Sequence, residues 1–432
     1  MASEYKVTKV TIWGHMVGAL AWNPSRNLGE FEFDPAFTKL GMDLAPLHMP
    51  IGRSREIFNF PDLNRTTYFG LPGMLADALP DRWGNQLIDR WLALRGRSRE
   101  DFSPAERLCY MGKRAMGALE FEPVLHGTNN RSVKVGIEHL VELARDILKQ
   151  RDSMSLNMND EKAEAIKEIL RVGTSAGGAR AKAVLAINPQ NGIIKSGQVD
   201  AGKGFEYWLL KLDGVTNREL GDPKEYGKIE YAYYLMAGAA GIEMTESKLI
   251  HEGNRAHFMT RRFDRGDNGE KIHLQSLCGI AHYDYNSPGA YSYEQAFQVM
   301  NRLRLDYPQK EQLFRRAVFN VMARNQDDHT KNISFLMNRD GVWRLAPAYD
   351  LTYAFNPENQ WTYRHQMLIN GKAENFNVSD LLELAGYAGI KNGPEIISQV
   401  RNALDKWFDF ADMAGLVKSR AERIAQGFRF PD

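Results

Sequence analysis

The chain has 432 residues, of which 25% are charged and 43% hydrophobic. This balance is ordinary for a soluble globular protein and excludes a collagen-like chain, a disulfide scaffold and a wholly disordered chain. Lys and Arg number 55 and Asp and Glu 54, for a formal net charge of +1, so no global charge draws the chain to nucleic acid or to an anionic membrane.

Two cysteines, Cys109 and Cys278, cannot build a disulfide framework, and we expect both to be reduced and buried in a cytoplasmic protein. The N-terminal sequence MASEYKVTKV lacks the apolar core of a signal peptide. No apolar run reaches the roughly eighteen residues that a membrane-spanning helix needs, so we expect no membrane segment.

Short strands are expected at the start of the chain, where apolar and polar residues alternate. The predicted strands cover residues 7–13, 17–22 and 31–33. From Leu71 onward the apolar spacing becomes helical, and a helix is expected to begin at Pro80-Asp81-Arg82. We place the first domain boundary in the polar segment between Pro123 and Val133, so residues 1–125 are predicted to form an N-terminal α/β subdomain.

The second predicted domain, residues 126–270, mixes helices and strands around a glycine-rich segment. Its expected elements are two helices over 135–171, strands over 183–187 and 205–212, a helix over 226–240 and a strand over 257–263. The third predicted domain, residues 271–432, is mostly helical by period, with one hairpin over 333–336 and 342–345. This order predicts an α+β fold with two lobes around a cleft.

The densest polar segment is RNQDDHTKN, residues 324–332, between an apolar helix and the hairpin, and Asp350 follows the hairpin in the sequence PAYDL. Phosphoryl transfer from Mg-ATP needs one carboxylate to accept the hydroxyl proton, and an amide with a second carboxylate to hold magnesium. In protein kinases the proton-accepting Asp and the metal-binding Asn occur in the motif D-x-x-x-x-N. Asp327 and Asn332 have this spacing. Lys331 lies inside this loop, where it could neutralise the transferred phosphoryl group.

Two other interpretations of this segment stay open. Asp327 and Asp328 could cap a turn beside a surface histidine, His329, and an isolated D-x-x-x-x-N motif is most often of that kind. The hairpin and Asp350, in the right order, favour the kinase interpretation. A metallohydrolase could use Asp327, Asp328 and His329, but the sequence has no second histidine cluster nearby.

The glycine-rich sequence GTSAGGARAK, residues 173–182, could bring backbone N–H groups close to phosphates. It differs from a Walker A loop because Ala179-Arg180 stands where Gly-Lys is required, which disfavours a P-loop NTPase. Lys211 lies in an apolar strand, where a charge needs a partner. The ATP phosphates or Glu230 on the next helix could be that partner. Alternatively, the Lys211 side chain could extend from an edge strand to water. Arg262 and Phe263 end a strand where the backbone of a kinase hinge would meet adenine, but for their side chains we favour the interpretation of a charged strand end.

Together these segments resemble the HipA family, the serine/threonine kinase toxins of bacterial toxin–antitoxin modules. The resemblance runs through most of the chain. It rests on residues 175–182 as the phosphate loop, on residues 327–332 as the catalytic loop and on Asp350 in PAYDL. In the N-terminal region it also includes Gly70-Leu71-Pro72, Trp83-Gly84 and residues 116–119.

The resemblance implies a two-lobed protein-kinase-like fold with a mostly helical C-terminal lobe, and roles for particular residues. Asp327 would be the catalytic base, Asn332 and Asp350 would bind Mg²⁺, and Glu230 would form a structural ion pair. Ser175 matches the serine that the family autophosphorylates, and a phosphate there would repel ATP phosphates and switch the kinase off. The predicted ATP- and phosphate-binding residues are Ser175, Ala176, Gly177, Gly178, Ala179, Lys182, Lys211, Arg262, Phe263, His329, Lys331 and Asn332.

Family membership would also imply partners. These are a HipB-like DNA-binding antitoxin, operator DNA contacted mainly through that antitoxin, and a protein substrate in translation such as an aminoacyl-tRNA synthetase. The near-neutral net charge of this chain agrees with DNA contacts being made mainly by the antitoxin. Two alternatives remain, a catalytically weak binding module that acts as corepressor with the antitoxin, and a small-molecule kinase with the same ATP machinery.

Overall fold

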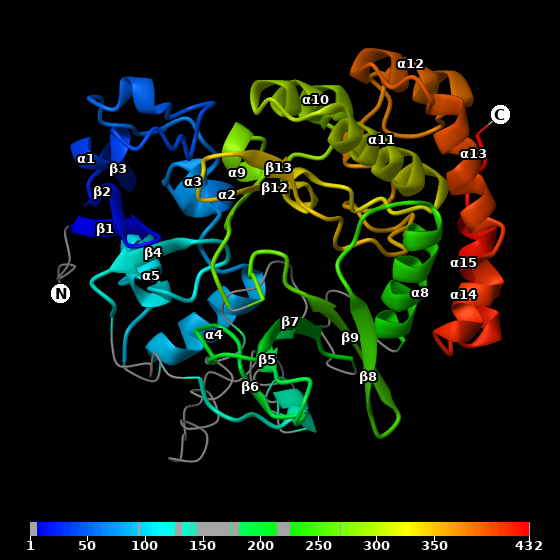
Figure 1. Ribbon diagram of the computed structural model, residues 1–432, viewed down its shortest axis with the longest axis horizontal. Coiled ribbons are helices and arrows are strands. Elements are labelled where there is room, and N and C mark those ends of the chain that lie inside the picture. The colour runs from blue at the N-terminus through cyan, green and yellow to red at the C-terminus, as the bar shows by residue number, and fades with distance from the viewer. Residues whose placement is uncertain are drawn as a thin grey trace. The chain divides into compact units, whose positions relative to one another are not determined.

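The computed structural model describes residues 7–93, 96–125, 132–138, 140–142, 144, 173, 181–213, 225–267 and 269–431. Its contacts divide the chain into two compact units. Figure 1 labels their helices and strands. Unit 1 comprises Met1–Lys224, Ile250–Leu274 and Arg339–Gly341. Unit 2 comprises Glu225–Leu249, Gln275–Asn338 and Val342–Asp432.

Unit 1 begins with a four-stranded antiparallel sheet of order β3-β2-β1-β4. Its strands are β1 (Val7–Ile12), β2 (His15–Asn23), β3 (Leu28–Phe33) and β4 (Leu119–Glu122). In β1 the buried side chains alternate with outward-facing ones, as a sheet with one buried face requires. This confirms the strands predicted from alternation at the start of the chain.

The helices of unit 1 follow β3, and α1 and α5 among them pack against this sheet. They are α1 (Pro35–Thr38), η1 (Ile51–Arg53), α2 (Arg65–Tyr68), α3 (Gly73–Ala76), α4 (Arg82–Ala93) and α5 (Pro104–Met111). Helix α5 begins with a capping box, in which Ser103 and Glu106 satisfy each other's backbone N–H groups, and it packs against β1, β2 and β4. Helix α4 begins at the position that Pro80-Asp81-Arg82 predicts.

A second sheet has five strands in the order β6-β5-β7-β9-β8. They are β5 (Lys182–Ile187), β6 (Ile194–Ser196), β7 (Glu206–Lys211), β8 (Ser247–Glu252) and β9 (Arg255–Arg261). Strands β5, β7 and β9 confirm the predicted strands, whereas β6 and β8 were not predicted. The predicted helices over 135–171 and the glycine-rich segment fall mostly outside the described residues.

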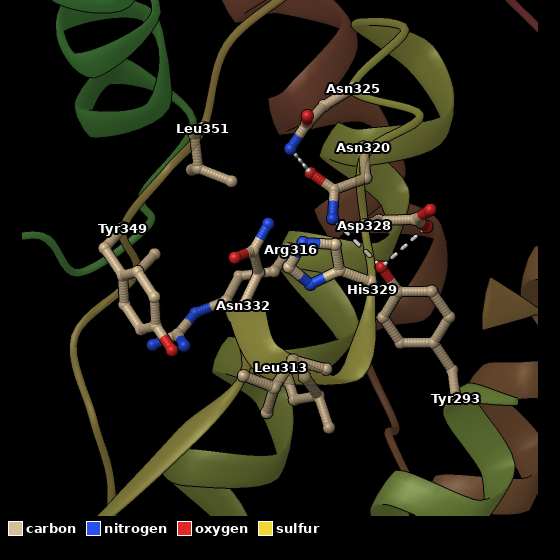
Figure 2. A pocket seen from close by; sticks show the side chains of 12 residues that line it. Tyr293, Leu313, Arg316, Asn320, Asn325, Asp328, His329, Asn332, Tyr349 and Leu351 are labelled. Atoms are coloured by element: carbon tan, nitrogen blue, oxygen red, sulfur yellow. Dashed lines mark hydrogen bonds between the residues drawn. The ribbon is translucent and has the colours of Figure 1, made fainter. Parts of the chain in front are cut away.

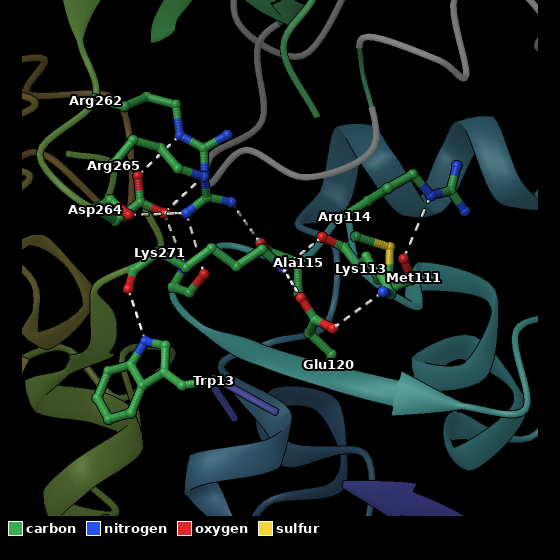
Figure 3. Close-up of polar contacts among 11 residues, drawn as sticks. Trp13, Met111, Lys113, Arg114, Ala115, Glu120, Arg262, Asp264, Arg265 and Lys271 are labelled. Carbon is green, nitrogen blue, oxygen red and sulfur yellow. Dashed lines mark hydrogen bonds and ion pairs between the residues drawn. The ribbon is translucent and has the colours of Figure 1, made fainter. Parts of the chain in front are cut away.

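A buried ionic cluster joins the N-terminal sheet region to the chain after β9 (Figure 3). The carboxylate of Asp264 contacts the guanidinium groups of Arg262 and Arg265 at 2.7 and 2.8 Å and accepts the Gly117 N–H at 2.8 Å. Lys271 lies 3.0 Å from the Glu120 carboxylate. Burial alone would raise the pKa of Asp264, but the two guanidinium groups hold it well below the usual range. The Asp264 carboxylate therefore stays ionised beside its two guanidinium partners inside unit 1.

Unit 2 is mostly helical, as predicted. Its helices are α8 (Tyr226–Ala239), α9 (Leu277–Ala281), α10 (Tyr293–Arg302), α11 (Tyr307–Met322), η3 (Thr330–Asn332), α12 (Val378–Ala388), α13 (Gly393–Leu404), α14 (Trp407–Met413) and α15 (Lys418–Gly427). Capping boxes begin α10 and α12, and each such cap contributes about 1 kcal/mol. Tyr233 on α8 packs edge-on against Phe319 and Trp407, which joins α8 to α11 and α14.

Short strands complete unit 2. They are β10 (His273–Ser276), β11 (Tyr291–Ser292), β12 (Ser334–Met337), β13 (Trp343–Leu345) and β14 (Met367–Leu368). Strands β12 and β13 form the predicted hairpin, and β10 extends it to three strands. Strands β11 and β14 pair in parallel, which brings the segment after Asp350 to the start of α10.

The division into units differs from the predicted domain list, because residues 225–249 group with the helical unit and the first predicted domain shares a unit with the sheet that follows it. Cys109 and Cys278 are both buried and are not joined in a disulfide, as expected. Within the part of the chain that the structure describes, every helix is too short or too polar to span a lipid bilayer.

Candidate active site

The candidate catalytic loop, residues 324–332, follows the C-terminal end of α11. Asp306 caps the start of this helix, and its last turn ends at Ala323. Arg324 then takes a left-handed conformation with φ 56°, which turns the chain away from the helix. The Asn320 side chain fixes the turn, because its oxygen accepts a hydrogen bond from the Asn325 amide at 2.9 Å.

Asp327 and Asn332 lie together in this loop, as predicted from their spacing. The Asn332 Nδ2 donates to the backbone carbonyl of Asp327 at 2.8 Å. The Asp327 side chain is 46% exposed, and its Oδ1 accepts a hydrogen bond from the Gln366 Nε2 at 2.8 Å. An exposed carboxylate held through one oxygen is suited to take a proton from a bound hydroxyl.

The neighbouring Asp328 is buried and anchors the loop. Its Oδ2 accepts hydrogen bonds from the Tyr293 hydroxyl at 3.1 Å and lies 3.0 Å from the His365 Nδ1. Its Oδ1 accepts the backbone N–H of Gln366 at 2.8 Å. All of these partners come from outside the loop, so Asp328 ties the loop to α10 and to the segment before β14.

This arrangement argues against the metallohydrolase interpretation. Both carboxylate oxygens of Asp328 accept hydrogen bonds, and its side chain is only 1% exposed. Among the described residues, no group of three or more His, Cys, Asp or Glu side chains is placed to hold a metal ion. The adjacent carboxylates Asp327 and Asp328 therefore differ in role, one exposed and one structural.

Asp350 lies on a segment that is tied to the catalytic loop at both ends. The Tyr349 hydroxyl donates to the Lys331 carbonyl at 2.7 Å. Further along, Ala354 pairs with the start of the loop, since its N–H donates to the Arg324 carbonyl at 3.1 Å. Asp350 itself has φ 54°, a conformation that is uncommon outside glycine and clusters at functional sites.

Asn332 and Asp350 fit a magnesium ion by donor type. The Asn332 Nδ2 is engaged with the Asp327 carbonyl, so the amide oxygen is the end that can coordinate a cation. Asp350 supplies a partly buried carboxylate. Mg²⁺ prefers such oxygen ligands and takes only one or two carboxylates, with phosphate oxygens and waters completing its shell.

A small polar cavity lies beside the loop (Figure 2). Its volume of about 20 Å³ is enough for about one water molecule. Among the described residues, three buried polar atoms of the lining have no hydrogen-bond partner: Arg316 Nε, Asn325 Oδ1 and His329 Nδ1. Burial lowers the pKa of Arg316 to about 10, partly offset by Glu243, so this guanidinium stays charged at neutral pH beneath the loop.

His329 and Lys331, both predicted to contact phosphates, are partly buried in the loop. The His329 Nε2 lies 3.8 Å from the Asp327 Oδ1. The Lys331 ammonium lies 5.3 Å from the centre of the Tyr285 ring, within range of a cation–π contact. Their contact with nucleotide remains a prediction.

The predicted phosphate contacts from unit 1 have partners in the structure that the sequence did not reveal. The Lys182 Nζ is buried and lies 3.3 Å from the Asp81 carboxylate. Lys211 ends β7 opposite Lys182 and has its ammonium 5.8 Å from the Phe258 ring centre. Glu230 is buried on α8 in unit 2, and its pairing with Lys211 remains a prediction.

The Arg262 side chain, predicted near adenine, forms a buried bidentate pair with Asp264 at 2.8 and 2.7 Å. The charge of Arg262 is therefore paired inside unit 1, which agrees with the interpretation of a charged strand end. Phe263, the other residue predicted near adenine, is partly buried. The predicted phosphate-loop residues Ser175, Ala176, Gly177, Gly178 and Ala179 lie outside the described residues.

Sequence reasoning missed Gln366 and the structural role of Asp328. Gln366 lies 39 residues after Asp327, in a segment without a motif, and no local pattern links them. The doubled Asp-Asp itself was visible, and a second carboxylate directly beside a catalytic one is a signal that one of them is structural.

Two family models match the chain. One is described as the HipA-like C-terminal domain and covers residues 174–427, and the other as the HipA N-terminal domain and covers residues 8–122. A solved structure with a similar fold is titled the Shewanella oneidensis MR-1 toxin–antitoxin system HipA, HipB and its operator DNA complex. The match has a TM-score of 0.65 at 16% identity and covers 97% of this chain and 94% of that one, which confirms the predicted two-lobed kinase-like fold.

Curated relatives match at low identity. A putative kinase of Haemophilus influenzae is 28% identical over 144 residues, which is 30% of this chain and 42% of that protein. The putative kinase Y4mE of Sinorhizobium fredii is 27% identical over 126 residues, which is 27% of this chain and 30% of that protein. The matches thus span less than half the length of either relative.

Proposed function

Because the chain belongs to the HipA family, we propose that it is a Mg-ATP-dependent serine/threonine protein kinase that arrests growth. The observation that carries the proposal is the loop at residues 327–332. It holds Asp327 exposed, Asp328 buried and Asn332 hydrogen-bonded to the Asp327 carbonyl. Kinase-like relatives and the kinase-like fold add support.

The proposed chemistry assigns each group a role. Asp327 accepts the proton of the acceptor hydroxyl. Asn332 and Asp350 would hold Mg²⁺, which neutralises charge on the ATP phosphates. Lys331 and His329 contribute positive or hydrogen-bonding groups beside the transferred phosphoryl group, and unit 1 supplies further ATP contacts through its glycine-rich segment, Lys182, Lys211, and Phe263.

The proposal includes self-inactivation. Phosphate on Ser175 adds about −1.5 to −2 charges in the glycine-rich segment and repels ATP phosphates. The chain thereby switches off its own transfer activity, independently of any partner.

The proposal also includes partners and location. The similar solved structure is a complex with HipB and operator DNA; we propose that this chain likewise binds a small DNA-binding antitoxin in the cytoplasm. DNA contact would come mainly from the antitoxin, because the chain carries a net charge of only +1. A component of translation, such as an aminoacyl-tRNA synthetase, is the proposed acceptor.

Induced expression in a bacterial host tests the proposal. The parent chain is expected to arrest growth, whereas Asp327→Ala and Asp350→Ala are expected to leave growth unaffected at equal protein levels. Asp340→Ala, in the exposed turn of the hairpin, is the matched control and should arrest growth like the parent. Growth arrest by all four chains would contradict the kinase proposal. If operator binding with the antitoxin then also persisted without ATP, the chain would act as a corepressor.

A further inference from the structure

Gln366 has a backbone that is fixed independently of its side chain. Its N–H donates to the Asp328 Oδ1 at 2.8 Å, and its carbonyl accepts the Gly289 N–H at 2.7 Å. It directly precedes β14, which pairs with β11. Because Asp328 is itself held by Tyr293 and His365, Gln366 is part of the most firmly bonded region of the site.

The Gln366 side chain reaches from this anchor to Asp327. Its Nε2 donates to the Asp327 Oδ1 at 2.8 Å, while its own Oε1 is buried with no hydrogen-bond partner among the described residues. The amide therefore contacts its surroundings through its donor end, which is directed at Asp327.

The contacts of the Asp327 carboxylate are one-sided. Gln366 and, at 3.8 Å, the His329 Nε2 both approach Oδ1. Within the described residues, Oδ2 has no hydrogen-bond or ion-pair partner. With Oδ1 held, the carboxylate cannot rotate freely, and Oδ2 is the oxygen left to meet an acceptor.

We infer that Gln366 is a positioning residue that orients Asp327 for proton abstraction, an inference that rests on the proposed function. As the acceptor oxygen bonds to the γ-phosphorus, its proton passes to Asp327 Oδ2. The bond from the γ-phosphorus to the bridging oxygen breaks, and its electron pair leaves with ADP. Gln366 touches none of the reacting atoms; it acts by limiting the rotation of the base.

The test uses Gln366→Met, which keeps the side-chain length and removes the donor. The two backbone hydrogen bonds of residue 366 do not depend on its side chain, so the unfolding midpoint should change little. Phosphate transfer from Mg-ATP is measured for the full chain, with the chain itself and a serine- and threonine-containing peptide pool as acceptors. The maximal rate should fall about 10–100-fold, with the ATP concentration at half-maximal rate changed less than about twofold.

Two further variants separate positioning from folding. Gln298→Met, at an exposed glutamine on α10, is the matched control and should transfer at the parental rate. Gln366→Glu keeps the side-chain length and replaces the donor Nε2 by an oxygen, so its transfer rate should fall at least as far as that of Gln366→Met. Parental transfer by the folded Gln366→Glu chain would contradict a need for the donor.

The double variant Asp327→Ala with Gln366→Met gives the decisive comparison. If Gln366 acts through Asp327, adding Gln366→Met to Asp327→Ala lowers the residual rate no further. Equal rates for the parent and Gln366→Met, or fully additive losses in the double variant, would overturn the inference while the kinase proposal stands. A parent chain that transfers no phosphate to any acceptor would instead overturn the proposed function, and the inference with it.

Discussion

Asp264 in unit 1 and Asp328 in unit 2 are both buried carboxylates, but they are stabilised by different partners. Asp264 contacts the guanidinium groups of Arg262 and Arg265 and the Gly117 N–H (Figure 3). Asp328 accepts from a tyrosine hydroxyl, a histidine ring nitrogen and a backbone N–H. Within the described residues, no Arg or Lys side chain contacts Asp328.

The difference matches what each region does. The ionic cluster in unit 1 links residues that lie more than a hundred positions apart, and it needs strength rather than precise orientation. The network around Asp328 lies beside the exposed carboxylate of Asp327, the proposed catalytic base, and its directional hydrogen bonds fix the loop. Ion pairs thus join distant segments of unit 1, whereas hydrogen bonds hold the loop that carries the proposed base.

The largest effect is expected from Asp264→Asn. The substitution leaves two buried guanidinium groups without their counter-ion, which costs about 3–5 kcal/mol of unfolding free energy. Denaturant titration measures the loss. Asp267→Asn is the control: its carboxylate pairs with Arg261 at 2.8 Å but is 92% exposed, so a change within about 0.5 kcal/mol is expected. Equal losses for both variants would show that burial of the pair is unimportant.

A smaller loss of stability is expected from Asp328→Asn, about 2–3 kcal/mol. The amide keeps the shape but replaces an ionic acceptor of hydrogen bonds. Phosphate transfer should fall as well, because the anchor of Gln366 is weakened. Thermal unfolding and a transfer assay on the same sample measure both effects, with Asp340→Asn in the exposed hairpin turn as control. A stable Asp328→Asn chain with parental transfer would remove Asp328 from the positioning network.

The ionic cluster also predicts a pH dependence. Burial, reinforced by Arg265, lowers the pKa of Lys271 from 10.5 to about 8. Between these values the unfolded chain binds more protons than the folded one, so the unfolding free energy rises with pH, by about 2 kcal/mol. Denaturant titrations at pH 7.5 and 10 measure the rise in the parent and in Lys271→Met. Lys271→Met should not show this rise in unfolding free energy. An equal rise between pH 7.5 and 10 in both chains would contradict the prediction.

The smallest effect is expected from Tyr293→Phe. The hydroxyl donates to Asp328 at 3.1 Å and accepts from the Asn320 amide at 2.9 Å, and its removal should cost about 1 kcal/mol. Asp328 keeps its contacts with His365 and Gln366, so transfer should fall only slightly. A thermal-shift measurement tests this loss of stability, with Tyr387→Phe, at an exposed tyrosine, as control. A loss of unfolding free energy as large as that of Asp328→Asn would mean that the Tyr293 hydroxyl dominates the network.

The sequence predicted what local pattern encodes. Alternation predicted β1, strand-like apolar runs predicted β5 and β7, and turn residues predicted the hairpin β12–β13. The interval from Asp327 to Asn332 identified a loop in which the two residues are hydrogen-bonded. The family resemblance supplied the two-lobed fold, which the structural match confirms.

The contacts that the sequence could not predict join distant segments. Lys182 pairs with Asp81, about a hundred residues earlier, and Gln366 reaches Asp327 from beyond the hairpin. Such partners depend on how helices and sheets pack, and no spacing rule encodes them. Burial of Arg262 against Asp264 has the same origin, because a charged strand end looks identical in sequence whether it faces solvent or another sheet.

The most direct test of the kinase account is to incubate the purified chain with Mg-ATP and map any added phosphate by mass spectrometry, with Asp327→Ala alongside. The account predicts phosphate on Ser175 in the parent and none on the Asp327→Ala chain. Phosphate on both chains to the same extent would contradict the assignment of Asp327 as the catalytic base.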